Sequence, residues 1–283
     1  MNDREASFDL ILPPAIAQKA VEAGVKKAHT DGLSLILLAI LAGAFISLGG
    51  MFFTVVTAGG SALPYGVMRL LGGVVFCLGL ILVILAGAEL FTGNNLMVMA
   101  WASGRISTRL LLRNWGIVYL GNLIGALATA ILAYFAGYYQ MGGGIVGQQV
   151  LTIAINKCAI PFGQGVALGI LCNALVCLAV WLTMSARTTT DKIVAILFPI
   201  SGFVAMGFEH SIANMFFIPM GWLLYRFDSQ WVQAHVSALD FTHLTLSGFL
   251  NNLVAVTLGN IIGGTLLVAM IYWFIYQRPK EQA

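Results

Sequence analysis

The chain has 283 residues, of which 59% are hydrophobic and only 9% are charged, and its formal net charge is +3. A soluble domain carries about 25% charged residues, so this sequence has too few to cover a soluble domain of its size. The same balance excludes a disordered chain and a nucleic-acid-binding protein. The sequence therefore predicts an all-α membrane protein, because its apolar stretches are continuous and do not alternate as β-barrel strands do.

Apolar stretches long enough for a transmembrane helix, about 20 residues, occur six times. They cover residues 33–58, 67–102, 115–138, 160–186, 193–225 and 248–275. Before them, residues 8–28 are typical of an amphipathic helix on the membrane surface, either a simple anchor or a mobile gate over a pore. The predicted parts are a cytoplasmic N-terminal segment (1–32), a six-helix transmembrane domain (33–277) and a cytoplasmic tail (278–283).

Lysine and arginine residues predict which side of the membrane each loop faces. Six spans place both termini on one side. All but three of the 14 lysines and arginines fall on that side, and the exceptions are Arg69, Lys157 and Arg226. The positive-inside rule therefore predicts that both termini lie in the cytoplasm and that the chain is a multi-pass protein of the cytoplasmic (inner) membrane.

Two patterns occur in both halves of the sequence. LGNLIGA at 120–126 matches LGNIIGG at 258–264, and their glycines are expected to let helices pack closely. In the second and fifth spans, a glutamate precedes an asparagine by five positions, at Glu89 and Asn94 and at Glu209 and Asn214. Each half has three spans, so the second copy must cross the membrane in the opposite direction. The sequence therefore predicts an inverted 3+3 repeat, a common plan for transporters and channels.

The second and fifth spans are much longer than the 20 or so residues that one crossing needs. We expect each helix to be broken, near residues 89–95 and 201–211, where polar residues interrupt the apolar sequence. Irregular backbone at membrane depth is tolerated only where protein or a water-filled cavity binds its polar groups. Paired breaks therefore predict the permeation site.

Charged and titratable residues in these spans have two interpretations each. Glu89 and Glu209 either cap free backbone N–H groups at the breaks or bind an ion or proton. His210 is a candidate proton donor, although on a helix it would point about 100° away from Glu209, so that both could not easily line one pore. Lys157 follows the stretch GYYQMGGGIVGQQ, which we expect to be flexible. There it acts as a lone cation that draws anions to the outer mouth, or it reaches the lipid headgroups.

Polar and aromatic side chains elsewhere in the spans add further candidates. Asn173 and Asn260 are amides inside apolar spans, and Thr92 is a hydroxyl at the first break. Phe76 and Phe203 either form hydrophobic constrictions or simply pack in the core. We find neither metal-ligand spacing nor a nucleophile–base pair, so we expect no cofactor and no enzymatic activity. The absence of an Asn-Pro-Ala motif argues against a water or glycerol channel.

Several stretches together resemble the formate/nitrite transporter family, and the resemblance covers essentially the whole chain. They are GAELFTGN at 87–94, GFEHSIANMFFIPMG at 207–221, LGNIIGG at 258–264, the FDLILP start and SGRIS at 103–107. The resemblance implies an aquaporin-like protomer with broken second and fifth helices, assembled in the lipid membrane as a homopentamer with one pore in each copy.

The family resemblance also implies roles for individual residues. Pore or substrate-binding roles fall on His210, Thr92, Lys157, Asn173 and Asn260. Constrictions fall on Phe76 and Phe203, with Leu80 and Val176 as further apolar candidates. The polar residues expected to support the breaks are Glu89, Glu209, Asn94 and Asn214, and Glu89 departs from the family pattern, which has an aspartate there.

The expected function is the passage of formate and related small monovalent anions, with a pH dependence linked to His210 as proton donor or fixed charge. The alternatives are a nitrite channel and an obligatory proton-coupled monocarboxylate transporter. Neither a cofactor nor a nucleic-acid partner is expected.

Overall fold

The computed structural model describes residues 11–59, 63–236 and 239–279, and all regular secondary structure in these ranges is helical. The elements are α1 (Pro13–Ala28), α2 (Gly32–Thr57), α3 (Tyr65–Leu82), the π-helical turn η2 (Val83–Gly87), the 3-10 turn η3 (Gly93–Met97), α4 (Val98–Ala102), α5 (Thr108–Phe135), the 3-10 turn η4 (Tyr138–Gly144), α6 (Ile145–Cys158), α7 (Phe162–Ser185), α8 (Thr189–Ala205), α9 (Ser211–Phe227), α10 (Ser229–His235), α11 (Leu246–Ile262), the π-helical segment η5 (Gly263–Met270) and α12 (Ile271–Tyr276). The FDLILP start and the last residues of the expected tail lie partly outside the described residues.

Five helical stretches are long and apolar enough to cross a membrane. They are Gly32–Thr57, Tyr65–Gly87, Thr108–Phe135, Phe162–Ser185 and Leu246–Tyr276. The expected fifth span contains two shorter helices, α8 and α9, and residues 206–210 between them are not helical. Residues 88–92, after η2, are likewise not helical.

Side-chain caps fix where several helices begin. Asp31 accepts a hydrogen bond from the backbone N–H of Ser34 at the start of α2, and Ser107 accepts from Leu110 at the start of α5. Thr188 forms a reciprocal capping box at the start of α8. Because such a cap binds an N–H group that has no partner within the helix, it sets the helix start from local sequence.

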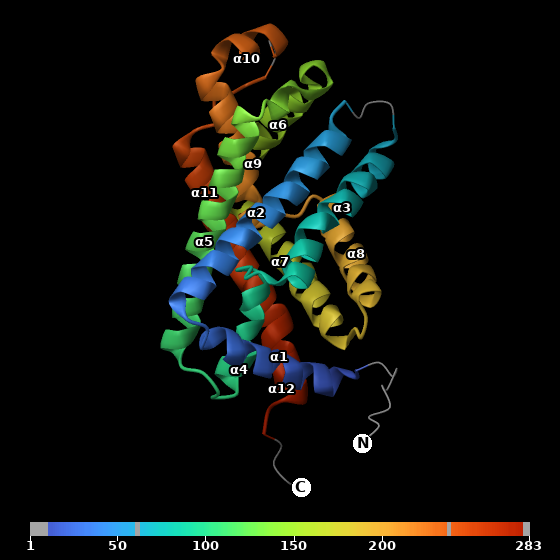
Figure 1. Cartoon of the computed structure of the whole chain (residues 1–283), viewed down its shortest axis with the longest axis vertical. Helices are drawn as coiled ribbons and strands as arrows, with labels where there is room; N and C mark the ends of the chain where they lie inside the picture. Colours follow the sequence, from blue (N-terminus) through green and yellow to red (C-terminus); the bar gives the residue numbers. More distant parts are fainter. Residues whose placement is uncertain (1–10, 60–62, 237–238, 280–283) are drawn as a thin grey trace.

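Helices α1 and α12 lie at the same end of the molecule, and α10 lies at the opposite end (Figure 1). Helix α1 lies across its end beside α4 and α12. Its six buried residues, Ile16, Ala17, Ala20, Val21, Gly24 and Ala28, form the face that packs on the rest of the chain. This helix is therefore docked on the protein.

The segment before α7, where we expected a flexible stretch, contains the ordered helix α6. The glycines Gly142, Gly143 and Gly144 adopt positive φ angles and form a left-handed kink between the 3-10 turn and α6. The buried faces of Leu151 and Ala154 hold α6 in the core. At 14 residues α6 is too short to resemble a membrane span, so the apolar pattern did not reveal it.

The repeated glycine motifs pack helices closely, as expected. A Cβ atom added to Gly125 on α5 would lie 2.0 Å from the carbonyl oxygen of Ile40 on α2. One added to Gly263, in the second motif, would lie 2.1 Å from the carbonyl oxygen of Ile170 on α7. Since both obstacles are backbone atoms, a side chain at these positions forces the helices apart.

We expect Gly125→Ala to destabilise the protein by about 1–3 kcal/mol, because the added methyl group overlaps the backbone of α2. Thermal or detergent denaturation of the purified protein measures this change. Gly116→Ala on the same helix is the matched control, since a Cβ there meets nothing within 4 Å. Equal denaturation midpoints for the two variants would contradict the close approach of α2 and α5.

Candidate functional site

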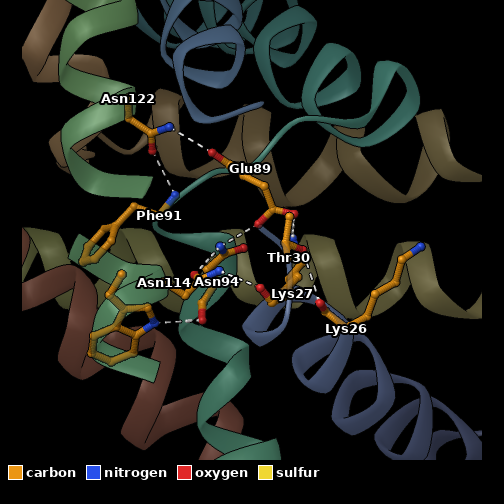
Figure 2. Close-up of polar contacts among 9 residues, drawn as sticks. Lys26, Lys27, Thr30, Glu89, Phe91, Asn94, Asn114 and Asn122 are labelled. Carbon is orange, nitrogen blue, oxygen red and sulfur yellow. Dashed lines mark hydrogen bonds and ion pairs between the residues drawn. The ribbon is translucent and has the colours of Figure 1, made fainter. Parts of the chain in front are cut away.

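The first interruption, at residues 88–92, is surrounded by a polar network (Figure 2). The Nζ of Lys27 lies 2.7 Å from Oε1 of Glu89. The side-chain amide of Asn94 donates to Oε2 of Glu89 at 2.7 Å and to Oδ1 of Asn114 at 2.9 Å. The amide of Asn114 in turn donates to the backbone carbonyl of Lys27 at 3.2 Å. The network therefore joins α1, the interruption, η3 and α5.

The second interruption, at residues 206–210, has the same network contact for contact. The Nζ of Lys157 lies 2.8 Å from Oε1 of Glu209. Asn214 donates to Oε2 of Glu209 at 2.6 Å and to Oδ1 of Asn252 at 2.7 Å. Asn252 donates to the backbone carbonyl of Lys157 at 2.8 Å. Lys157 is thus half of an ion pair, which corrects the expectation of a lone cation.

Asn122, from the first LGN motif, binds the free backbone groups of the first interruption (Figure 2). Its Nδ2 donates to the carbonyls of Ala39 at 2.8 Å and Glu89 at 2.9 Å. Its Oδ1 accepts from the N–H of Phe91 at 2.9 Å. One buried amide therefore binds an N–H and a carbonyl of the interruption and connects them to a carbonyl of α2.

Asn260, from the second LGN motif, makes the equivalent contacts. It donates to the carbonyls of Gly169 at 2.9 Å and Glu209 at 3.0 Å, and it accepts from the N–H of Ser211 at 2.9 Å. The capping role that the sequence assigned to the glutamates therefore belongs to the asparagines. The carboxylates bind lysine and asparagine side chains instead.

His210 caps the start of α9. Its Nδ1 accepts a hydrogen bond from the backbone N–H of Ala213 at 3.1 Å, so Nδ1 carries no proton. A neutral imidazole has one N–H group, which must then be on Nε2, 2.9 Å from Oγ1 of Thr92. This tautomer is assigned from the hydrogen-bond network. An imidazolium would turn its Nδ1–H toward the N–H of Ala213, so this geometry holds His210 neutral.

One cavity of about 340 Å³ lies beside the second interruption, and we call it the Lys157 cavity. Lys157, Glu209, Phe76, Phe203 and His210 contribute to its lining. Glu209 and His210 both line it, and because residues 208–210 are not helical, the helical angle of about 100° between neighbours does not apply. The helical geometry from which we expected the two side chains to diverge is therefore absent.

A second cavity of about 170 Å³, the Lys27 cavity, lies beside the first interruption. Lys27 is the one charged side chain in its lining among the described residues, and Asn94 is also present. Leu80 and Leu90 separate this cavity from the centre of the molecule. Each interruption thus lies beside a cavity that contains a lysine paired to a glutamate.

Between the two cavities lies a central cavity of only about 10 Å³. Its lining is apolar except for one imidazole, and it comprises Ile46, Phe76, Leu80, Leu90, Val176, Ile200, Phe203 and His210. The rings of Phe76 and Phe203 meet edge to face at 5.8 Å between centroids. All four residues predicted for constrictions therefore line the narrow centre.

Ile46, Leu90 and Ile200 were not predicted for the narrow centre. The internal repeat could have predicted a central position for Leu90, because Leu90 follows Glu89 as His210 follows Glu209. Leu90 therefore occupies the position in the first half that His210 occupies in the second. The two equivalent positions meet at the central cavity, and only one of them is polar.

Three predicted pore residues, Thr92, Asn173 and Asn260, are buried and line none of these three cavities. The amide of Asn173 donates to Oδ1 of Asn95 at 2.7 Å and to the carbonyl of Asn260 at 2.7 Å. These residues connect the helices behind the cavities. In the described part of the chain, no group of three His, Cys, Asp or Glu side chains is arranged to bind a metal.

Comparison with known proteins gives consistent matches over the whole chain. A family profile described as formate/nitrite transporter matches residues 14–274. Formate channel FocA of Escherichia coli K12 is 47% identical over 277 residues, covering 97% of each chain. Formate channel FocB of the same strain is 41% identical, covering 97% of this chain and 98% of its own. A solved structure titled as a pentameric formate channel with formate bound is similar with a TM-score of 0.81 and 44% identity, covering 87% of this chain and 98% of that one.

We expect Lys157→Met to destabilise the protein by about 3 kcal/mol, because it leaves the carboxylate of Glu209 buried without its cation. The Glu209 side chain is 6% exposed, whereas Glu89 and Lys27 are 13% and 31% exposed, so Lys27→Met is expected to cost less. Denaturation midpoints in detergent measure both.

The double variant Lys157→Met/Glu209→Gln tests whether the ion pair is the cause. Removing the orphaned charge is expected to restore part of the lost stability. A double variant less stable than Lys157→Met alone would show that the two residues act independently.

Proposed function

The chain belongs to the formate/nitrite transporter family, and we propose that it is a channel for formate and related small monovalent anions. One observation carries the proposal: two cavities that each contain a lysine are separated by a narrow apolar centre with a single imidazole. Positive side chains at both approaches favour anions, and an apolar narrowing selects against hydrated ions. The names of the FocA and FocB relatives support formate as the first substrate to test.

We propose that the two halves of the chain form an inverted repeat. The paired networks around Glu89 and Glu209 support this, because equivalent residues make equivalent contacts. In this arrangement α3 with α4, and α8 with α9, act as the broken second and fifth of six transmembrane segments, as in an aquaporin-like fold. The distribution of lysine and arginine supports cytoplasmic termini in the inner membrane, with the Lys157 cavity facing outward.

The working unit that we propose is a homopentamer. The similar solved structure is described as a pentameric formate channel, and the proposed number of five subunits rests on that similarity. Large apolar side chains such as Leu120, Leu132 and Phe135 are exposed on α5 of the single copy. Neighbouring copies and lipid would cover such surfaces in the membrane.

Each cavity lysine forms an ion pair with a glutamate, an arrangement that favours passage of an anion over tight binding of it. The ammonium group can donate a hydrogen bond to an anion inside the cavity, and the adjacent carboxylate limits how strongly the anion is held. A channel site must attract an ion enough to admit it and weakly enough to release it. The ion pairs of Lys27 and Lys157 meet both conditions on the two sides of the centre.

Formate meets its barrier at the central cavity. Moving a bare carboxylate into an apolar constriction is costly, so we propose that it crosses there as neutral formic acid. His210 is the one titratable side chain that lines this cavity among the described residues. When it takes a proton from the acidic side, Nδ1 releases the N–H of Ala213, and Nε2 passes a proton to a carboxylate oxygen of formate. His210 is then neutral with its remaining proton on Nδ1, and it regains the capped form when Nε2 takes up a proton and Nδ1 releases one to water.

Formate influx into proteoliposomes is expected to rise as the external pH falls, and His210→Asn is expected to lose most of this pH dependence. Asparagine supplies an acceptor for the N–H of Ala213 but takes up no proton near neutral pH. Stopped-flow measurement of wild type and variant across pH 5–8 checks this.

Coincident pH profiles would instead mean that His210 only caps α9 and that formate takes its proton from solvent. Nitrite in place of formate tests the nitrite-channel alternative in the same vesicles. Saturating influx driven only by a proton gradient would indicate an obligatory proton-coupled transporter.

Shortening Leu90 is expected to widen the passage between the central and Lys27 cavities. We expect Leu90→Ala to raise acetate influx relative to formate by about tenfold, since acetate is larger by one methyl group. Leu120→Ala is the matched control, because Leu120 is exposed on α5 and lines none of the three cavities. An unchanged acetate-to-formate ratio in Leu90→Ala would place the size-limiting constriction elsewhere.

A further inference from the structure

Arg69, on α3, also lines the Lys157 cavity. We infer that Arg69 supplies the net positive charge of this cavity and recruits anions into it from outside. This inference rests on the proposed function of the chain as an anion channel. Neither the paired networks nor the central cavity includes this residue. Its position near the start of α3 places it at the approach to the narrow centre formed by Phe76 and Phe203.

The charges that line the Lys157 cavity would cancel if Arg69 were absent. Among the described residues its charged lining side chains are Arg69, Lys157 and Glu209. Lys157 and Glu209 neutralise each other as an ion pair at 2.8 Å. Gaps in the description at 60–62 and 237–238 contain no charged residue in the sequence. One positive charge therefore remains, and it belongs to Arg69.

Arg69 is held in place by backbone carbonyls, which leaves its charge uncancelled. Its Nε donates to the carbonyl of Ala205 at 3.0 Å, and an Nη donates to the carbonyl of Val204. Both carbonyls end α8, where the partial negative charge of the helix is about half a unit. The nearby start of α9 presents a partial positive charge of similar size. The described residues offer no carboxylate within ion-pair distance of Arg69.

The guanidinium also has donors available for an anion. It carries five N–H groups in a planar fork, and its contacts with the carbonyls of Ala205 and Val204 use two of them. A planar fork suits a carboxylate geometrically better than the point charge of a lysine. Among the described residues the Lys27 cavity has no second cation in its lining, so the unpaired cation of the Lys157 cavity has no counterpart there.

Formate influx from the outer side at two ionic strengths tests the inference. Right-side-out membrane vesicles that contain the full-length chain are assayed at about 10 mM and about 1 M salt, where charges act over about 30 Å and about 3 Å. Arg69→Gln is expected to lower influx about threefold at low salt and to match wild type at high salt. Arg69→Lys is expected to retain most of the low-salt influx.

Arg226→Gln is the matched control, because Arg226 is an exposed cation in the last turn of α9 and does not line the cavity. It is expected to leave influx unchanged. Gln164→Glu is a second measurement, since Gln164 lines the cavity and the helix cap made by Arg69 stays in place. The added negative charge is expected to lower influx at low salt only.

Wild-type influx in Arg69→Gln at both salt concentrations would overturn the inference. An equal, salt-independent loss in Arg69→Gln and Arg69→Lys would also overturn it, because Arg69 would then only cap α8. Failure of Gln164→Glu to lower low-salt influx would overturn the role of cavity charge. Absence of formate influx in the wild type is a distinct result, which would overturn the proposed function and this inference with it.

Discussion

The structure depends on hydrogen bonds to the backbone N–H and C=O groups that are left free where helices end inside the membrane. Each unpaired N–H or C=O in hydrocarbon costs several kcal/mol, so an interruption needs a partner for every group that it frees. Asn122 and Asn260 supply part of this need, because each binds one N–H and one carbonyl at an interruption and a carbonyl of a neighbouring helix. Close packing at Gly125 and Gly263 brings the neighbouring helices near enough for these amides to reach. The cavities and their charges depend on this support.

The two halves share a scaffold and differ in the residue that it presents. Glutamate, asparagine and lysine contacts are repeated around Glu89 and Glu209, whereas Leu90 and His210 occupy equivalent positions at the centre. A symmetric framework thus holds an asymmetric pair of side chains. One half supplies an apolar wall and the other supplies the titratable group, so the chemistry of the centre comes from a single substitution within a repeated plan.

Sequence patterns predicted most of the scaffold, because apolar stretches, repeated LGN motifs and paired polar residues are local signals. The family resemblance, not a local pattern, implied constrictions at Phe76, Phe203, Leu80 and Val176, and all four line the central cavity. Sequence patterns missed α6, whose burial comes from tertiary contacts and not from a long apolar stretch. The ion-pair partner of Lys157 was also missed, since it is 52 residues away in sequence and no local pattern specifies it.

Because His210 caps α9 through Nδ1, the protonation state of its imidazole is coupled to a backbone hydrogen bond of that helix. A charged imidazole cannot accept from the N–H of Ala213, so each protonation frees that amide and loosens the first turn of α9. Ser211, in the same turn, is bound through its own N–H to Asn260, which limits how far the loosening spreads. Amide hydrogen exchange at Ala213 would therefore report the charge of the His210 side chain.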